Sequence, residues 1–262
     1  IYNSGIIGDI TGDFIGNYSS DSVGGAIFND YDSSIGNIIG DFIGNHSKAY
    51  GGAINNSGRT AIGNITGDFI GNYASYDVGS ANGGAIDNIG TIGNITGDFV
   101  NNSVEGNLFN GPQGGAIYNR PLNGGSTSIG NITGDFIGNS VVSESTWPSY
   151  GGAIYNSTNA AAQTATIGDI TGNFIGNHAS NANTHAYGGA IYNYSYNKNN
   201  LATIGVISGS FIGNYAEGKG MALGGAIYTS DNLTLASKGK NIQFSGNYTI
   251  TDGNRVNNAI FM

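Results

Sequence analysis

The sequence has no cysteine and is poor in proline and in charge, with 0 Cys, 3 Pro and 10% charged residues among 262. Without Cys the chain forms no disulfide and offers no thiolate to a metal, although this absence leaves the compartment open. No segment has the roughly 18 to 20 consecutive apolar residues that a membrane-spanning helix requires. We therefore expect neither disulfides nor a membrane span in this segment.

Positive charge is especially scarce. The chain carries 8 Lys and Arg against 17 Asp and Glu, for a net charge of −9, and neither sign forms a run. Nucleic acid is bound by clustered basic side chains, so it is not an expected partner. No signal peptide is recognisable and the first residue is Ile1, so we expect a processed or excised segment of an exported protein.

Glycine is abundant instead, with 47 residues, and it occurs beside a hydrophobic fraction of 39%. A high glycine content alone is typical of low-complexity chains, because glycine adds backbone entropy to the unfolded state and has no side chain to bury. The apolar residues are regularly spaced, however, which a packed core requires and a disordered chain does not. The composition therefore favours a folded, repetitive protein.

Two sequence blocks alternate along the chain, one of the form I-G-x-I-T-G-D-F-I-G-N and one of the form G-G-A-I-Y-N. Copies of the second block start between 27 residues (Gly24 to Gly51) and 37 residues (Gly114 to Gly151) apart, while the blocks hardly change. Constant blocks joined by connections of variable length are typical of a solenoid. Residues 1–262 are thus predicted to form one solenoid domain, with an atypical last coil over 231–262.

The blocks are dense in glycine, β-branched and aromatic residues, which disfavour helix and favour strand. We therefore predict an all-β fold, a single-stranded parallel β-solenoid of about eight coils with one coil per repeat.

The tetrapeptides Gly151-Gly152-Ala153-Ile154 and Phe136-Ile137-Gly138-Asn139 recur in alternation along nearly the whole chain. In this pairing the chain resembles the passenger domains of autotransporters, especially the polymorphic outer membrane protein group, whose repeats are defined by these two motifs. The resemblance implies a right-handed parallel β-helix that is secreted through the outer membrane of a bacterium and used in adhesion. Both a segment of such a precursor and a free secreted relative fit this pattern.

Equivalent positions of stacked coils form columns, so each residue type is judged by its column. A Phe column and the Ile column of the second block are predicted to fill the core. An Asn column that ends each first block is predicted to form a hydrogen-bonded turn ladder without a ligand. These columns are Phe14, Phe42, Phe69, Phe99, Phe136, Phe174, Phe211 and Phe244; Ile27, Ile54, Ile86, Ile117, Ile154, Ile191 and Ile227; and Asn17, Asn45, Asn72, Asn102, Asn139, Asn177, Asn214 and Asn247.

The position after the inward Ile admits polar residues and so faces outward by strand alternation. In the C-terminal half it is Tyr118, Tyr155, Tyr192 and Tyr228, with Trp147, Tyr150 and Tyr187 in or beside the neighbouring connections. We expect this exposed aromatic ladder and its loops to bind glycans or proteins of a cell surface or host. The alternative is that the tyrosines only cover a sheet beneath long loops.

Two further columns adjoin the Phe column. Ile15, Ile43, Ile70, Val100, Ile137 and Ile175 either follow a bend of the chain or form an outward apolar stripe suited to lateral packing. Asp13, Asp41, Asp68, Asp98 and Asp135 form an acidic ladder that must be solvated, hydrogen-bonded or bridged by a hard cation. We expect no cofactor, with Ca²⁺ on the Asp ladder as the alternative.

The two ends of the chain match the same phase of the second block. Ile1, Tyr2 and Asn3 correspond to its tail, and Ile260, Phe261 and Met262 belong to a worn copy. Because an uncapped solenoid exposes unpaired strand edges, we expect these ends to meet either more of the same polypeptide or the next copy of the chain.

An enzyme on this fold would need a unique cluster of acids or bases that breaks the repeat. The basic residues are scattered, and His46, His178 and His185 have no metal-ligand spacing. We expect no enzymatic activity. The sequence predicts a secreted structural and adhesive solenoid of the bacterial cell surface that assembles end to end or laterally with itself. The alternatives are a monomeric glycan-binding passenger and, less favoured, a polysaccharide-degrading β-helix enzyme.

Overall fold

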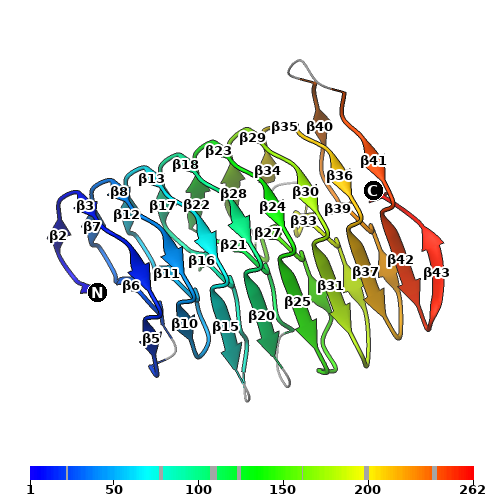
Figure 1. Cartoon of the computed structure of the whole chain (residues 1–262), viewed down its shortest axis with the longest axis horizontal. Helices are drawn as coiled ribbons and strands as arrows, with labels where there is room; N and C mark the ends of the chain where they lie inside the picture. Colours follow the sequence, from blue (N-terminus) through cyan, green and yellow to red (C-terminus); the bar gives the residue numbers. More distant parts are fainter. Residues whose placement is uncertain are drawn as a thin grey trace.

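The computed structural model describes residues 1–21, 23–76, 79–106, 111–122, 125–160, 162–197, 201–237 and 241–262. Its described residues form short strands and no helix, and none of them offers a helical span of membrane-crossing length and apolarity. The strands stack along the long axis of the molecule from the N-terminus to the C-terminus (Figure 1). The predicted all-β solenoid is thus confirmed.

Six sheets run parallel to this axis, and each coil contributes one strand to most of them. Sheet A contains β1 (Tyr2–Asn3), β6 (Ile27–Asn29), β11 (Ile54–Asn56), β16 (Ile86–Asn88), β21 (Ile117–Asn119), β27 (Ile154–Ser157), β33 (Ile191–Tyr194), β39 (Ile227–Thr229) and β44 (Ile260–Phe261). Sheet B contains β2 (Ile6–Ile7), β7 (Ser34–Ile35), β12 (Ala61–Ile62), β17 (Thr91–Ile92), β22 (Ser126–Ile129), β28 (Thr164–Ile167) and β34 (Leu201–Ile204).

Sheets C and D follow in each coil. Sheet C contains β3 (Ile10–Thr11), β8 (Ile38–Ile39), β13 (Ile65–Thr66), β18 (Ile95–Thr96), β23 (Ile132–Thr133), β29 (Ile170–Thr171), β35 (Val206–Ser208) and β40 (Thr234–Leu235). Sheet D contains β4 (Phe14–Ile15), β9 (Phe42–Ile43), β14 (Phe69–Ile70), β19 (Phe99–Val100), β24 (Phe136–Ile137), β30 (Phe174–Ile175), β36 (Phe211–Ile212) and β41 (Phe244–Ser245). Sheets C and D contain eight strands each, which confirms the prediction of about eight coils.

Sheets E and F complete the coil. Sheet E contains β5 (Tyr18–Ser19), β10 (His46–Ser47), β15 (Tyr73–Tyr76), β20 (Ser103–Gly106), β25 (Ser140–Ser143), β31 (His178–Asn181), β37 (Tyr215–Gly218), β42 (Tyr248–Thr251) and β43 (Asn254–Asn257). Sheet F contains β26 (Ser149–Tyr150), β32 (Ala186–Tyr187) and β38 (Ala222–Leu223). Neighbouring coils pair in parallel and in register, as in Phe99↔Phe136, and the one antiparallel pair of these strands is β42 with β43.

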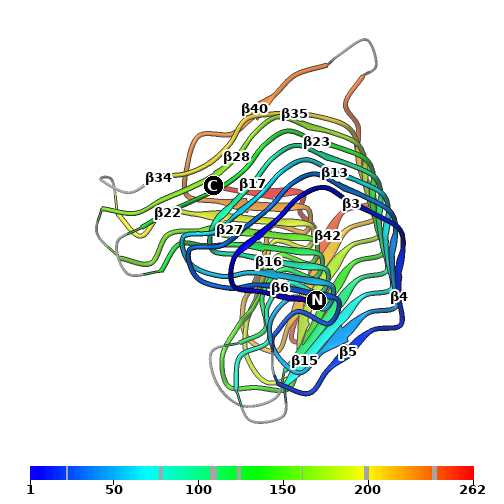
Figure 2. The ribbon, with the colours of Figure 1, turned by 90° about the vertical axis from the view of Figure 1, so that its left-hand side faces the viewer.

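Seen from its N-terminal end, the chain turns clockwise as it runs away from the viewer, so the β-helix is right-handed (Figure 2). The cross-section has two lobes. Sheets A to D enclose the larger one, whose core contains the Ile and Phe columns. Sheets E and F enclose the smaller one around small side chains, among them Ala74, Val104, Val141 and Ala179. The outer face of sheet A therefore lies in the corner between the lobes.

The Phe column is a continuous stack inside the larger lobe. Neighbouring rings such as Phe69 and Phe99 have centroids 4.8 Å apart and planes 1° apart. From Phe42 to Phe211 these side chains are fully buried, as predicted, and so is the Ile column of the second block. Burying such rings and aliphatic side chains provides the main driving force for folding of the coil.

Glycine pairs in the second block allow the backbones of neighbouring coils to meet closely. Gly151 has a φ of +62°, a conformation that strains other residues. A Cβ on Gly152 would lie 2.0 Å from the carbonyl oxygen of Gly189 in the next coil. The repeated G-G is therefore a requirement of the turn into sheet A.

The Asn column forms a buried ladder of side-chain amides along the axis. Asn139 Nδ2 donates to Asn177 Oδ1 at 2.9 Å and to the Phe99 carbonyl at 2.8 Å. Its own Oδ1 accepts from the backbone and side chain of Asn102, both at 3.0 Å. The predicted turn ladder is confirmed. A second ladder, which the sequence analysis did not assign, runs through sheet A, where Asn119 Nδ2 donates to Asn156 Oδ1 at 2.8 Å.

Substitution of Asn139 by Asp tests this ladder. The isosteric carboxylate has no N–H, so both donated hydrogen bonds are lost and a charge is buried between two acceptors. We expect a loss of about 3 kcal/mol or more in the free energy of unfolding near neutral pH, measured by denaturant titration, with partial recovery in acid as the carboxylate protonates.

The matched control is Asn101→Asp, at an exposed position with a φ of 53°. It should change the free energy of unfolding by less than about 0.5 kcal/mol. Equal stability of the two variants would contradict the ladder's role.

Candidate functional site

The tyrosine column lies on the outer face of sheet A, and it points away from the core as predicted. Tyr118, Tyr155, Tyr192 and Tyr228 stack in register, with ring centroids 5.0 to 5.2 Å apart. The expected exposure, however, is wrong for three of them. Tyr118, Tyr155 and Tyr192 are only 2%, 6% and 7% exposed. Strand alternation determines the side on which a residue lies but not what packs over that side.

Sheet F covers this column. Tyr150 of β26 packs edge-on against Tyr155 and Tyr192, at centroid distances of 5.9 and 4.9 Å. Tyr187 of β32 lies 5.4 Å from Tyr228. The alternative interpretation, in which the tyrosines cover a sheet beneath long connections, thus accounts for much of their burial.

A groove opens beside these rings, with a volume of about 380 Å³. We call it the aromatic groove. It is lined by Ser80, Asn82, Gln113, Tyr118, Arg120, Trp147, Tyr150, Tyr155, Ser157, Thr158, Asn159, Tyr192, Tyr194 and Tyr196. Trp147 and Tyr196 are 50% and 58% exposed, so they present accessible aromatic faces.

The structure brings most of the predicted binding residues together. Five of the seven line the aromatic groove, namely Tyr118, Tyr155, Tyr192, Trp147 and Tyr150. The other two, Tyr187 and Tyr228, pack against Tyr192. The groove is therefore a site built by several coils, with a floor from sheet A and a wall from sheet F.

Burial favours the neutral hydroxyls of three tyrosines in the groove. It raises the pKa values of Tyr118, Tyr150 and Tyr192 well above the ordinary value of 10.0. Neutral hydroxyls both donate and accept hydrogen bonds. Together with the side-chain amides of Asn82 and Gln113, they make a surface that is aromatic and rich in uncharged polar groups.

Two charged residues at this face were not assigned as site residues from the sequence. Asp87 occupies the tyrosine column one coil before Tyr118 and is 1% exposed. Arg120 follows β21, and its guanidinium Cζ lies 5.5 Å from the centre of the Tyr118 ring. Among the described residues, Asp87 Oδ1 and Arg120 Nε are buried without a hydrogen-bond partner. The available signal was the position of Arg120 two residues after a column tyrosine.

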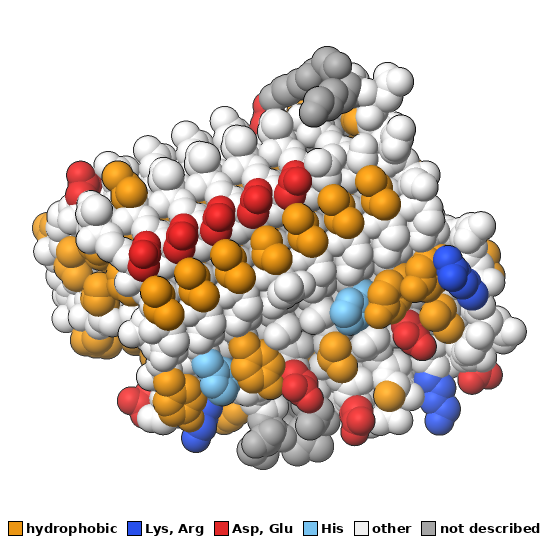
Figure 3. Space-filling model, in the orientation of Figure 1, with side chains coloured by type: hydrophobic (Ala, Val, Ile, Leu, Met, Phe, Trp, Pro, Cys, Tyr) orange, Lys and Arg blue, Asp and Glu red, His pale blue; other side chains and the backbone are white. Residues whose placement is uncertain are grey.

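The Asp ladder is hydrogen-bonded between coils. The backbone N–H of Asp41 donates to Asp13 Oδ1 at 3.0 Å, and that of Asp135 donates to Asp98 Oδ1 at 2.7 Å. Figure 3 shows the ladder as a straight acidic row. In each pair, one carboxylate oxygen thus accepts a hydrogen bond from the next coil, as in the hydrogen-bonded alternative for this ladder. The described part of the chain has no group of three or more His, Cys, Asp or Glu suited to a metal. Ca²⁺ binding stays untested.

The Ile column that follows the Phe column faces outward. Of the two alternatives, a bend of the chain or an outward apolar stripe, the structure has the outward stripe. Ile15 is 64% exposed and Ile212 is 38% exposed. The members of the column between them, from Ile43 to Ile175, are half-buried. They form a continuous apolar row beside the Asp ladder (Figure 3).

The predicted assembly residues lie at the edges of sheet A. β1, with Tyr2 and Asn3, pairs with β6, and β44, with Ile260 and Phe261, pairs with β39. Ile1 and Met262 are 51% and 75% exposed. In sheet E, however, β43 folds back antiparallel on β42 and covers its edge. Parallel continuation of sheet E beyond β42 would have to displace this hairpin, and end-to-end assembly stays a prediction.

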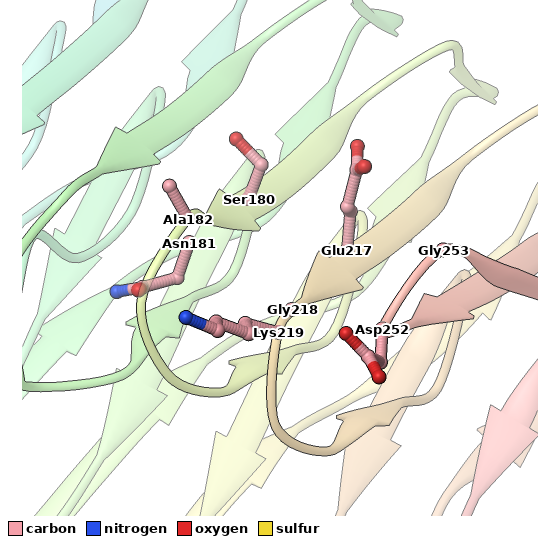
Figure 4. A pocket seen from close by; sticks show the side chains of 8 residues that line it. All are labelled: Ser180, Asn181, Ala182, Glu217, Gly218, Lys219, Asp252 and Gly253. Carbon is pink, nitrogen blue, oxygen red and sulfur yellow. The ribbon is translucent and has the colours of Figure 1, made fainter.

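A second hollow lies at the connections after sheet E (Figure 4). It has a volume of about 540 Å³ and is lined by Ser180, Asn181, Ala182, Glu217, Gly218, Lys219, Asp252 and Gly253. The carboxylates of Glu217 and Asp252 and the ammonium of Lys219 do not converge on one point (Figure 4). This open hollow lacks the aromatic faces of the groove.

The substitution Asp87→Asn removes the buried acid while keeping its shape. Burial raises the pKa of Asp87 from 3.8 to about 8, against the opposing charge of Arg120. Between about pH 4 and 8 the folded chain therefore holds a proton that the unfolded chain has released, so Asp87 costs more stability as pH rises, up to about pH 8. We expect the variant to match the wild-type Tm at pH 4 and to exceed it by several degrees at pH 9.

Circular dichroism melting curves at both pH values provide the measurement. Asp32→Asn, at an exposed position, is the matched control and should show no pH-dependent gain. A Tm difference for Asp87→Asn that is the same at both pH values would contradict the burial of a neutral acid.

Comparison with known proteins finds no family model, no curated protein and no solved structure that matches this chain.

Proposed function

We propose that this chain is an extracellular scaffold of the bacterial cell surface that binds saccharides in the aromatic groove. The observation that carries the proposal is the convergence of accessible and buried aromatic rings, from several coils, on one groove with uncharged polar groups. Sugar rings have C–H faces that pack on aromatic side chains and hydroxyls that exchange hydrogen bonds with amides and hydroxyls.

The size of the groove favours a small ligand over a protein. Its volume of about 380 Å³ lies within the range of small-molecule sites, roughly 300 to 1,000 Å³. A stable protein partner would need a contact of about 800 Å² on each side, for which a recessed groove is poorly shaped. The end of a glycan chain fits this setting.

The fold supports a scaffold role because binding residues are carried on connections while the repeats stay constant. Trp147 and Tyr150 lie in the long connection between β25 and β27, and Tyr194 and Tyr196 lie at and after the end of β33. Loops displayed on a rigid frame are a common place for recognition. The resemblance of the repeats to autotransporter passengers supports the proposed extracellular location.

Isothermal titration calorimetry, with ligands chosen by a glycan array, tests the proposal. Trp147→Ala removes the one tryptophan ring of the groove, which is half exposed, and should weaken binding at least about 10-fold, or about 1.4 kcal/mol. Tyr31→Ala is the matched control, because Tyr31 is 61% exposed but does not line the groove. It should leave the Kd within about 2-fold of wild type. Equal Kd values for both variants, or no binding to any glycan of the array, would contradict the proposal.

A further inference from the structure

Arg120 is the one charged side chain among the described residues that line the aromatic groove. This is unexpected in a chain with 8 basic and 17 acidic residues. A ligand that enters the groove therefore meets a local positive charge on a protein of net negative charge. Such a charge selects between ligands more strongly inside a recessed, partly dry site than on an open surface.

The guanidinium of Arg120 is held in place but is not saturated. Its Cζ lies 5.5 Å from the centre of the Tyr118 ring, and the guanidinium interacts electrostatically with the side chain of Tyr155. A guanidinium has five N–H donors; Nε of Arg120 is buried without a partner among the described residues, so the donors that a ligand would meet are those of the two Nη atoms. The contact with the Tyr118 ring limits the entropy that the side chain would lose when a ligand binds.

The side chain of Asp87 interacts with Arg120, but Asp87 does not neutralise the charge of Arg120 at physiological pH. Asp87 acts on the guanidinium by a Coulombic interaction, and Asp87 Oδ1 has no hydrogen-bond partner among the described residues. Burial raises the pKa of Asp87 to about 8, so its neutral form predominates at pH 7. The tyrosines that interact with Arg120 are Tyr50, Tyr118 and Tyr155, and burial raises the pKa of each of them, so their hydroxyls are neutral at pH 7. The positive charge of Arg120 is thus left for a ligand.

We propose that the aromatic groove selects acidic saccharides, whose carboxylate binds the Arg120 guanidinium while a sugar ring packs on the neighbouring aromatic side chains. This inference rests on the proposed function, and it adds the class of saccharide. Arginine recognises carboxylates by paired, charge-assisted hydrogen bonds, which are about twice as strong as neutral ones. Uronic acids and sialic acids are two sugar classes that supply such a carboxylate.

Two matched ligand pairs test this selectivity in wild-type protein by calorimetry at pH 7. Trigalacturonate is compared with its methyl ester, and sialyllactose is compared with lactose. We expect the acid of at least one pair to bind about 10-fold or more tightly than its neutral partner. The pair that shows the preference identifies the source of the carboxylate.

Arginine variants then assign the preference to a residue. Arg120→Gln should bring the acid to within about 2-fold of the neutral ligand, while Arg120→Lys should keep part of the preference because it keeps the charge. Arg59→Gln is the matched control, because Arg59 is exposed and lies outside the groove, and it should keep the full preference. Near-ultraviolet circular dichroism verifies that each variant is folded.

The outcomes separate the two proposals. Equal affinity within both pairs in wild-type protein would overturn the acidic specificity and leave saccharide binding in place. A preference that survives in folded Arg120→Gln would overturn the role of Arg120. No binding to any of the four ligands would overturn this inference and, together with an inactive glycan array, the proposed function.

Discussion

The structure depends on hydrogen bonds that run from coil to coil between identical positions. The buried amides of the Asn column, such as that of Asn139, have their donors and acceptor satisfied by the same position in the adjacent coils and by the backbone beside it. A buried amide without these partners would cost roughly 1 to 3 kcal/mol, so a shift of the chain by one residue is costly at every turn. The blocks therefore stay constant, and change is confined to the connections.

This division explains where the candidate site lies. Early coils contribute only single bridging residues to the wall that faces sheet A, among them Tyr50, Asn82 and Gln113. Later coils have longer connections, and their bridges become the strands of sheet F. The aromatic groove forms where these longer connections place tyrosines and Trp147 over the column on sheet A. The repeat thus supplies the frame, and the growth of the connections supplies the site.

The columns could be predicted from the sequence because every coil repeats the same environment. The buried Phe stack, the Asn ladder and the hydrogen-bonded Asp ladder follow from this repetition. The burial of Tyr118 could not be predicted in the same way, because it depends on how distant connections fold back over the sheet. Asp87 and Arg120 were missed as a pair for a related reason: Asp87 is the single acid in the tyrosine column and Arg120 belongs to no column of basic residues, so only the packing of neighbouring coils brings them to one face.

The most direct test of the account uses the single tryptophan of the chain, Trp147, as a reporter of the groove. Its emission is measured while wild-type protein is titrated with a saccharide shown by calorimetry to bind. Binding in the groove predicts a saturable change in intensity or wavelength, with the Kd that calorimetry gives. Emission that stays constant through calorimetric saturation would place the bound ligand elsewhere and contradict the assignment of the site.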